Sequence, residues 1–247
     1  MPGVPGLSRR PPTRPATRGP LVRVGHKGAD HVAPGNTVES FEAALAHGVD
    51  MIEFDVLRTR DGRLVLAHDH DDAEGRDCLT LEQGLDHFAG EAYNRIELDV
   101  DMKLPGYELE VVEGLRERGL AERSLVSTMY PESLDRLGEL APGLRRGWSV
   151  PRVRRNYLRS PLAVPAYVIV RAMRARLPGQ AVRRIRAGGC EAIMANQILM
   201  SRRLVRAVHG AGGQLYVWTV DSARRIEALE ALGVDGVITN DPRLFSR

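Results

Sequence analysis

Short apolar runs alternate with longer amphipathic runs along most of this chain. The short runs are rich in Val, Ile and Leu, which favours strands, and the longer runs repeat apolar residues at helical spacing. We expect strands at Leu21–Gly25, Met51–Val56, Leu64–Ala67, Arg95–Met102, Ser124–Thr128, Arg145–Val150, Ala192–Ala195, Gln214–Thr219 and Asp235–Thr239. We expect helices at Val38–His47, Leu79–Phe88, Tyr107–Arg118, Pro131–Leu140, Ser201–Gly210 and Ser222–Leu232. Between Val150 and Ala192 the pattern is irregular.

The second and third predicted strands are joined by a loop that contains Asp61-Gly62. This dipeptide is a strong signal for a hairpin with a two-residue turn, because both turn positions need a positive φ. With that turn, Asp55 pairs with His68, and the alternation of strand side chains puts Glu53 on the same face. The hairpin therefore predicts a cluster of two carboxylates and one imidazole.

The third strand must return antiparallel beside the second, because a parallel crossover needs a dozen or more residues. Removing it from the nine candidates leaves eight strands, most of them separated by helices. This order predicts an α/β fold, a (β/α)8 TIM barrel with a β-hairpin after strand 2. A doubly wound open sheet is the alternative, but the sequence lacks the G-x-G-x-x-G fingerprint that would favour it.

The first 20 residues differ in composition from the rest of the chain. They hold six prolines, four arginines and no acid. This predicts a disordered Pro/Arg-rich tail over 1–20 and one barrel domain over 21–247. The whole chain carries a formal net charge of +3, so without the four tail arginines residues 21–247 carry −1. That balance excludes a basic globule that binds nucleic acid.

The cellular location is expected to be cytoplasmic. No apolar run reaches the length of a membrane span, and the amino terminus lacks the apolar core of a secretory signal. Cys78 and Cys190 are too few and too far apart in the sequence for a disulfide framework.

Reactive side chains gather at the carboxyl ends of the predicted strands, where barrel enzymes hold their active sites. They are His26, Glu53, Asp55, His68, Asp101, Lys103 and Trp218. Three carboxylates suit one hard divalent cation, Mg²⁺ or Ca²⁺, which would polarise a phosphoryl oxygen. Two histidines can act as general base and general acid, and Lys103 can offset charge on a phosphate. Trp218 can stack on a substrate or cap the barrel mouth. Together these groups predict cleavage of a phosphodiester.

Over about residues 21–245 the chain resembles the glycerophosphodiester phosphodiesterases. The resemblance rests on His26-Lys27-Gly28, Pro34-Gly35-Asn36-Thr37, Glu53-Phe54-Asp55, His68-Asp69, Asp101-Met102-Lys103, Val217-Trp218-Thr219-Val220 and the stretch from Gly233 to Pro242. It implies metal-dependent hydrolysis of a glycerophosphodiester to glycerol 3-phosphate and an alcohol. By the family pattern, His26 and His68 are the acid–base pair. The implied metal ligands are Glu53, Asp55 and Asp101, and Lys103 contacts the phosphate.

Three positions depart from the family pattern. Lys27 stands where Arg is usual, so a phosphate contact there keeps its charge but loses the bidentate fork. Gly35 stands where Glu is usual, which removes one carboxylate, and Asp101 is one methylene shorter than the usual Glu. These departures leave the head group of the substrate and the native metal open.

The segment 151–190 holds ten arginines and no acid, together with an apolar stretch over 162–170. This composition is typical of a peripheral contact with an anionic membrane. The alternative is an ordinary barrel helix with an inward apolar face and solvated arginines. The substrate is accordingly a small-molecule or a lipid-derived phosphodiester. Two further readings are lysophospholipase D-type hydrolysis of a lysophospholipid at the membrane surface and a non-catalytic barrel that binds phosphodiesters.

Overall fold

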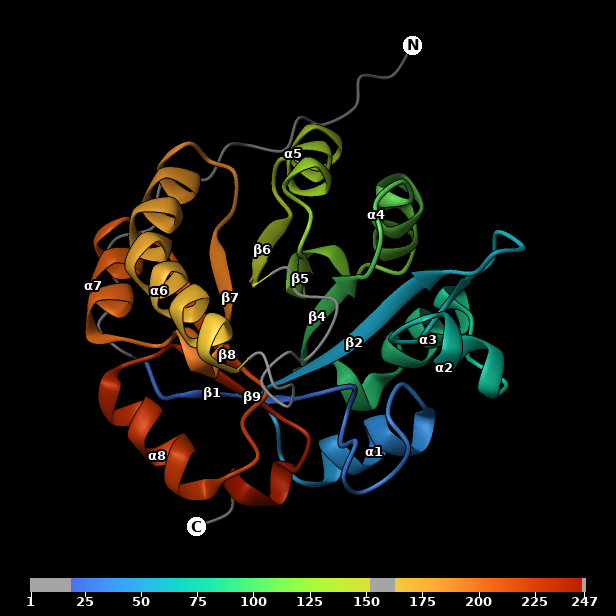
Figure 1. The fold of residues 1–247 in the computed structure, drawn as a ribbon. Helices are drawn as coiled ribbons and strands as arrows, with labels where there is room; N and C mark the ends of the chain where they lie inside the picture. The colour runs from blue at the N-terminus through green and yellow to red at the C-terminus, as the bar shows by residue number, and fades with distance from the viewer. Residues whose placement is uncertain (1–18, 152–162, 246–247) are drawn as a thin grey trace.

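Eight parallel strands close into a barrel in the computed structural model, which describes residues 19–151 and 163–245. The strands are β1 (Val22–Gly25), β2 (Met51–Arg58), β4 (Glu97–Met102), β5 (Ser124–Thr128), β6 (Arg145–Val150), β7 (Ala192–Asn196), β8 (Gln214–Trp218) and β9 (Gly236–Thr239). The ring closes because β1 pairs in parallel with both β2 and β9 (Figure 1). The predicted TIM barrel is confirmed, and the open sheet is wrong.

Helices surround the barrel and connect successive strands. They are α1 (Val38–Ala46), α3 (Leu81–Phe88), α4 (Glu108–Glu117), α5 (Pro131–Leu140), α6 (Ala163–Arg186), α7 (Arg202–Gly210) and α8 (Ala223–Leu232). Side chains cap several of their amino ends: Thr37, Thr80 and Ser201 each accept a hydrogen bond from a backbone N–H of the first turn. The short helix α2 (His70–Gly75) was not expected from the sequence.

The barrel interior is a packed core. One buried cluster contains a residue from each of six strands: Val24, Met51, Leu125, Met194, Tyr216 and Ile238. Strand side chains alternate, so the residues two positions further on point the same way. Those positions are His26, Glu53, Ser127, Asn196, Trp218 and Asn240. The same alternation that fills the core therefore delivers polar groups to the carboxyl ends of the strands.

The hairpin after β2 exists, but its predicted register is wrong by one residue. Strand β3 (Leu64–Val65) pairs Leu64 with Arg58. The loop has three residues, since Thr59 N donates to Arg63 O at 2.9 Å and Gly62 N donates to Thr59 O at 3.0 Å. Gly62 has φ +91°, as in a type I turn closed by a bulge rather than a two-residue turn. The ladder ends at Val65, so Asp55 does not pair with His68.

The segment between β6 and β7 is more regular than the sequence predicts. Helix α6 spans 24 residues, although Pro178 lies inside it. A proline in a helix interior removes one hydrogen bond, which is why the sequence pattern favours an irregular segment there. Leu177 and Ala181 are buried in a core cluster shared with α7. This part of α6 therefore packs an apolar face against the barrel, a feature of the alternative in which the segment forms a barrel helix.

Two predictions fall on residues outside the described ranges. The disordered tail over 1–20 is described only at Gly19 and Pro20, and residues 152–162 of the arginine-rich segment are not described. Among the described residues, no helix is long and apolar enough to cross a membrane.

Candidate active site

Three carboxylates meet at the carboxyl end of β2 and β4. Glu53, Asp55 and Asp101 each offer one oxygen, and these oxygens all lie within 4.8 Å of one another. Asp55 and Asp101 are directly opposite each other, because β2 and β4 pair in register at these residues. Glu53 and Asp55 are buried and Asp101 is half-buried. Oxygen ligands at this spacing fit one hard divalent cation.

Lys103 is the cation that faces this cluster in the structure. Its Nζ forms an ion pair with Asp55 and donates a hydrogen bond to Asp101 Oδ2 at 2.6 Å. Burial would lower the pKa of Lys103, but the charges of Asp101, Asp55 and Glu53 outweigh it and raise that pKa well above its ordinary value. Lys103 is therefore a fixed positive charge next to the carboxylates.

The carboxylates differ in how easily they ionise. Burial, followed by the charge of Asp55, raises the pKa of Glu53 well above its usual range. Burial acts the same way on Asp55, but Lys103 and the nearby imidazoles of His68 and His26 outweigh it and lower that pKa. The ammonium of Lys103 thus offsets only part of the negative charge of these carboxylates.

A fourth carboxyl group, that of buried Asp99, adds to the crowding of acids on these two strands. Burial, and then the charge of Asp101, raises the pKa of Asp99 to about 8. Among the described residues, Asp99 Oδ1 has no hydrogen-bond partner. So many carboxylates in one place repel one another unless a cation is bound. The donor set and its charge therefore fit a divalent metal.

Asn36 holds Asp55 in position. Its Nδ2 donates to Asp55 Oδ2 at 2.9 Å, and Asp55 N donates to Asn36 Oδ1 at 3.0 Å. Asn36 is buried and has φ +61°, a left-handed conformation that asparagine tolerates better than most residues. The pair fixes one metal-ligand candidate on β2 to the loop that precedes α1.

His26 follows β1, and the side-chain amide of Asn240 orients its ring. Its Nδ1 lies 2.5 Å from Asn240 Oδ1, and Asn240 Nδ2 donates to Asp221 Oδ2 at 2.7 Å. Since the amide nitrogen faces the carboxylate, Asn240 presents oxygen to the imidazole, and Nδ1 carries the proton. The other nitrogen, Nε2, then points at the carboxylates, 3.8 Å from Glu53 Oε2. Burial lowers the pKa of His26, against the opposite effect of Asp55, which favours the neutral ring.

His68 reaches the site from a loop and not from the hairpin ladder. Its side chain is 52% exposed, and its Nδ1 lies 3.0 Å from Asp69 Oδ2. Asp72 accepts a hydrogen bond from His68 N at 3.0 Å and is itself bound by Arg76. His68 is near enough to Asp55 for its charge to lower the pKa of that carboxyl. The two histidines thus approach the carboxylates from different segments, the end of β1 and the loop that follows β3.

Lys27 and Trp218, the two remaining predicted substrate contacts, already bind other groups of the protein. Lys27 donates its backbone N–H to Glu53 Oε2 at 2.8 Å, and its Nζ lies 3.2 Å from Asp30 Oδ2. Trp218 is half-buried at the end of β8, where its Nε1 donates to Met194 O at 2.8 Å. The ring of Trp218 therefore has a fixed orientation at the barrel mouth.

The sequence analysis assigned no role to Asn36, Asn240, Asp221 or Asp99. Alternation along the strands was the available signal for two of them, since Asn240 lies two residues after buried Ile238 and Asp99 two before Asp101. No local pattern indicated that Asn36 contacts Asp55.

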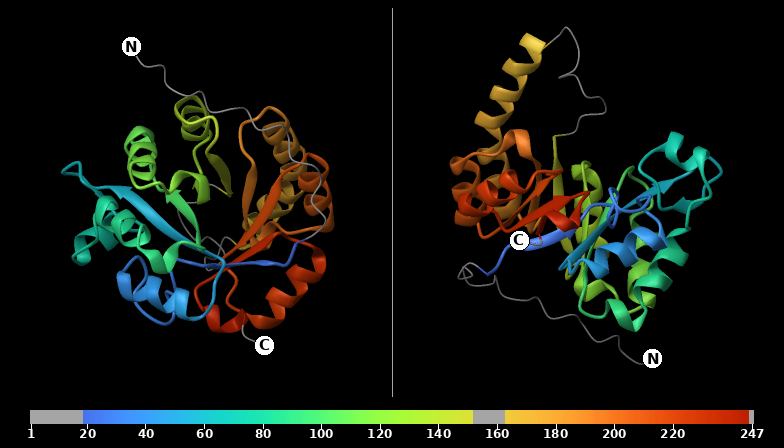
Figure 2. Two further views of the ribbon diagram at one scale, coloured as in Figure 1. Left: turned by 180° about the vertical axis from the view of Figure 1, so that it is seen from behind. Right: turned by 90° about the horizontal axis from the view of Figure 1, so that it is seen from below.

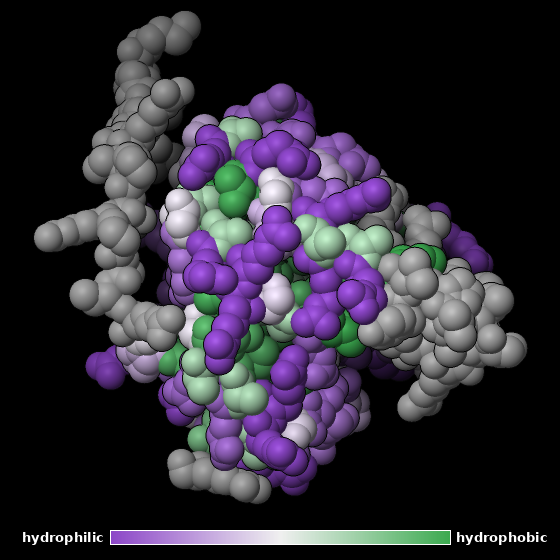
Figure 3. Space-filling model, turned by 60° about the vertical axis from the view of Figure 1, so that its left-hand side comes forward, coloured by the Kyte–Doolittle hydropathy of each residue, from purple (hydrophilic) through white to green (hydrophobic). Residues whose placement is uncertain are grey.

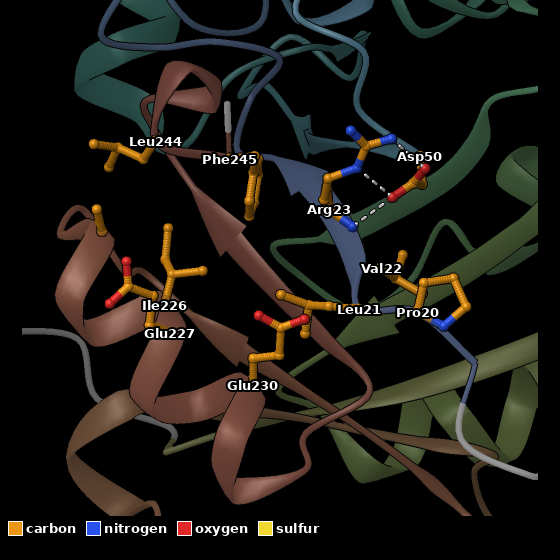
Figure 4. Close-up of a pocket in the computed structure, with 11 residues that line it drawn as sticks. Pro20, Leu21, Val22, Arg23, Asp50, Ile226, Glu227, Glu230, Leu244 and Phe245 are labelled. Carbon is orange, nitrogen blue, oxygen red and sulfur yellow. Dashed lines mark hydrogen bonds and ion pairs between the residues drawn. The ribbon is translucent and has the colours of Figure 1, made fainter. Parts of the chain in front are cut away.

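Two cavities in the described part of the chain lie away from the carboxylates. One of about 480 Å³ lies between the amino end of β1 and α8 (Figure 4). Its Arg23 and Asp50 satisfy each other through two side-chain hydrogen bonds of 2.9 and 2.8 Å. In barrels this end of the strands serves stability and not catalysis. We therefore assign the chemistry to the carboxylate cluster.

Comparison with known proteins identifies the family of this chain. The profile of the glycerophosphoryl diester phosphodiesterase family matches residues 26–76 and 77–244. A glycerophosphodiester phosphodiesterase of Caldanaerobacter subterraneus subsp. tengcongensis is 27% identical, over 89% of this chain and 93% of its own.

Two solved structures share the fold. A putative glycerophosphoryl diester phosphodiesterase of Silicibacter pomeroyi superposes with a TM-score of 0.71 at 21% identity, covering 92% of this chain and 93% of its own. An Oleispira antarctica phosphodiesterase, in complex with the product sn-glycerol-3-phosphate, superposes with a TM-score of 0.69 at 19% identity, covering 92% and 96%.

Proposed function

The chain belongs to the glycerophosphoryl diester phosphodiesterase family, and on that premise we propose that it hydrolyses a glycerophosphodiester to glycerol 3-phosphate and an alcohol. Relatives of nearly the same length are phosphodiesterases of this kind. The observation that carries the proposal is the meeting of three carboxylates within 4.8 Å beside an oriented imidazole. A folding core has no need of such a cluster.

One divalent cation, Mg²⁺ or Ca²⁺, is proposed as the cofactor, held by Glu53, Asp55 and Asp101. Such a cation, when bound, would polarise a phosphoryl oxygen of the diester. Asn36 keeps Asp55 aimed into the site through two hydrogen bonds. Lys103 is proposed to contact the phosphate, where its ammonium offsets charge that develops as the P–O bond breaks.

His26 is proposed as the general base. Its Nδ1 is engaged by Asn240 and burial lowers its pKa, so Nε2 is free to take the proton of the attacking O–H group. His68 is proposed as the general acid, which donates a proton to the oxygen of the leaving alcohol. Its exposed position at the rim suits contact with a leaving group that departs toward solvent.

Lys27 and Trp218 are proposed as further substrate contacts. The ion pair with Asp30 holds Lys27 beside Glu53, and Lys27 would add a second positive charge near the phosphate. The fixed indole of Trp218 would pack against the glycerol or the leaving group. These contacts would select the diester, whereas the two histidines carry out its cleavage.

The test is hydrolysis of glycerophosphocholine, with glycerol 3-phosphate detected by a coupled assay. His26→Ala and His68→Ala should each lower kcat by about 10² to 10⁴, the usual worth of a positioned acid or base. The double variant should lose far less than the product of the two effects, because the groups act as a unit. His47→Ala, at the end of α1, is the control and should leave kcat unchanged. Near-normal kcat in either single variant would refute the assignment.

A lysophospholipid is the second candidate substrate, hydrolysed in the manner of a lysophospholipase D. The observation that favours it is the arginine-rich helix α6, which supports peripheral contact between an anionic membrane and the segment 151–190. Residues 152–162 of that segment lie outside the described ranges, so the case depends on α6.

A further inference from the structure

Helix α6 has two different faces. Leu177 and Ala181 are buried against the barrel side, and Arg174 donates to Met200 O at 2.6 Å. The opposite face carries Ile169, Arg176 and Arg183, spaced by seven residues and hence nearly in line along the helix. Both arginines are exposed, and Ile169 is 59% exposed. The outward face thus begins with an apolar side chain and continues with positive ones.

The charge of α6 has one sign. Its 24 residues include six arginines and no acid: Arg171, Arg174, Arg176, Arg183, Arg184 and Arg186. Arg184 is compensated by Asp135 at 2.8 Å. Within the part of the chain that the structure describes, no acid forms an ion pair with Arg176, Arg183 or Arg186. Because residues 21–247 carry a net charge of only −1, this concentration of positive charge is a local feature.

The first turns of α6 lie at the active-site end of the barrel, whereas its last turns, with Arg183 and Arg186, lie toward the opposite end, where Arg146 near the start of β6 donates to Gly188 O. The chain enters α6 after β6, whose carboxyl end lies at the rim. In the right-hand view of Figure 2 the first turns of α6 project beyond the barrel, on the side toward which the β2–β3 hairpin also extends. A flat surface that touches the start of α6 would therefore lie near the mouth of the site.

The side of the molecule formed by α6, α7 and α8 is otherwise hydrophilic. Purple, hydrophilic side chains predominate in Figure 3, with smaller green patches between them. A helix that cannot span a bilayer, exposes an apolar side chain such as Ile169 and carries several arginines has the composition of an interfacial helix. A polyanion such as nucleic acid would complement the charge but would leave Ile169 without a partner.

We propose that the outward face of α6 docks on the surface of an anionic lipid bilayer, with the rim of the active site beside that surface. The arginines meet lipid phosphates while Ile169 enters the interface. The substrate taken from that surface is a lysophospholipid. This last step rests on the proposed function, whereas docking itself does not.

Sedimentation with vesicles tests the docking. Vesicles of phosphatidylcholine with phosphatidylglycerol should bind the full chain, those of phosphatidylcholine alone should not, and high salt should weaken the binding. The variant R176Q/R183Q/R186Q should bind roughly 100-fold more weakly, since each arginine near an anionic surface contributes about one kcal/mol. Ile169→Ser should also weaken binding without changing the charge.

A charge-matched variant controls for net charge. R95Q/R116Q/R136Q removes three exposed arginines near β4 and on α4 and α5, away from α6. It should bind vesicles like the unmodified chain. Equal loss in both triple variants, equal binding to neutral vesicles, or tighter binding to an oligonucleotide than to vesicles would overturn the proposal.

Hydrolysis of glycerophosphocholine in solution separates the two proposals. The α6 variant should keep this activity and lose hydrolysis of a lysophospholipid presented in anionic vesicles. Soluble activity without vesicle binding would overturn docking and leave the phosphodiesterase intact. Vesicle binding without any diester hydrolysis would refute the proposed function and leave docking intact.

Discussion

At the scale of single residues, two asparagines hold the groups to which we assign the chemistry. Asn36 bonds both the side chain and the backbone of Asp55, and Asn240 links His26 to Asp221. An amide suits both places because it offers a donor and an acceptor without adding a charge. Each asparagine is far from its partner in sequence, so its role depends on closure of the barrel.

Asn240→Ala should lower kcat for a soluble diester by roughly ten-fold, because the ring of His26 loses its only hydrogen bond among the described residues while the proposed catalytic groups remain. A double-mutant cycle is the measurement. If Asn240 acts through His26, adding Asn240→Ala to His26→Ala should cost little more. An equal ten-fold loss in both backgrounds would contradict this positioning role.

Gly35→Ala should lower the free energy of unfolding by about 1 to 3 kcal/mol, the usual cost of overpacking. An added Cβ would lie 2.5 Å from Asp30 Oδ1 and 2.8 Å from Lys27 Cβ, so the ion pair would have to move. Denaturant unfolding gives the measurement. Gly143→Ala is the matched control, since a Cβ there meets nothing within 4 Å. Equal effects of the two changes would count against the close packing at Gly35.

At the scale of elements, the loop between β3 and α3 carries His68 and is stabilised by charge. Arg76 Nε donates to Asp72 Oδ1 at 2.8 Å, and Arg76 Nη2 donates to Leu66 O at 2.9 Å. Asp72 also accepts from His68 N. The short helix α2 thus ties the start of the loop to its end, and the position of His68 depends on one aspartate.

Asp72→Asn should destabilise the protein by about 1 kcal/mol at neutral pH, a modest figure because the ion pair is partly exposed. The hydrogen bond with Arg76 lowers the pKa of Asp72 in the folded protein below its ordinary 3.8. A carboxyl with a lowered folded pKa stabilises fully above its unfolded pKa and ceases to do so as the pH falls through the folded pKa. The loss in the free energy of unfolding caused by Asp72→Asn should therefore be complete above pH 3.8 and vanish at lower pH.

Urea unfolding at a series of pH values measures this dependence. Asp71→Asn provides the control, because Asp71 is the exposed neighbour in the same helix and its loss removes the same charge. A penalty for Asp72→Asn that persists unchanged well below pH 3.8 would show that its cause is not the ionised carboxyl.

At the scale of the whole molecule, pairing of β2 with β4 within the barrel brings like charges together. Glu53, Asp55, Asp99 and Asp101 come from two paired strands, and each is held near the others by the register of β2 with β4. Lys103 offsets part of that repulsion. We therefore expect a divalent cation bound at these carboxylates to stabilise the fold.

Adding Mg²⁺ or Ca²⁺ to chelator-treated protein should raise Tm. A cation at 100 times its Kd that binds only the folded state stabilises it by about 2.7 kcal/mol. Glu53→Gln should lose most of that increase, and Glu42→Gln, at an exposed site on α1, should keep it. Thermal unfolding with and without the cation measures the effect. No rise in Tm with either ion would refute a metal site at these carboxylates.

The sequence by itself determined the local elements and the chemical groups. Strand and helix ranges such as Ser124–Thr128 and Pro131–Leu140 coincide with β5 and α5, because periodicity and caps are local properties. The count of eight strands and the place of His26, Glu53, Asp55, Asp101 and Lys103 at strand ends also followed from local patterns. Those patterns sufficed to predict the barrel and the carboxylate cluster.

The tertiary structure alone decided how these groups act on one another. A three-residue loop ending at Gly62 set the hairpin register and separated His68 from the ladder. The bond between His26 and Asn240 joins residues 214 positions apart, and no local signal encodes such a contact. Burial, which raises the pKa of Glu53, and the two faces of α6 also exist only once the chain has closed. Local sequence fixes which hydrogen bonds a segment makes within itself, whereas electrostatics and long-range contacts depend on what packing brings near.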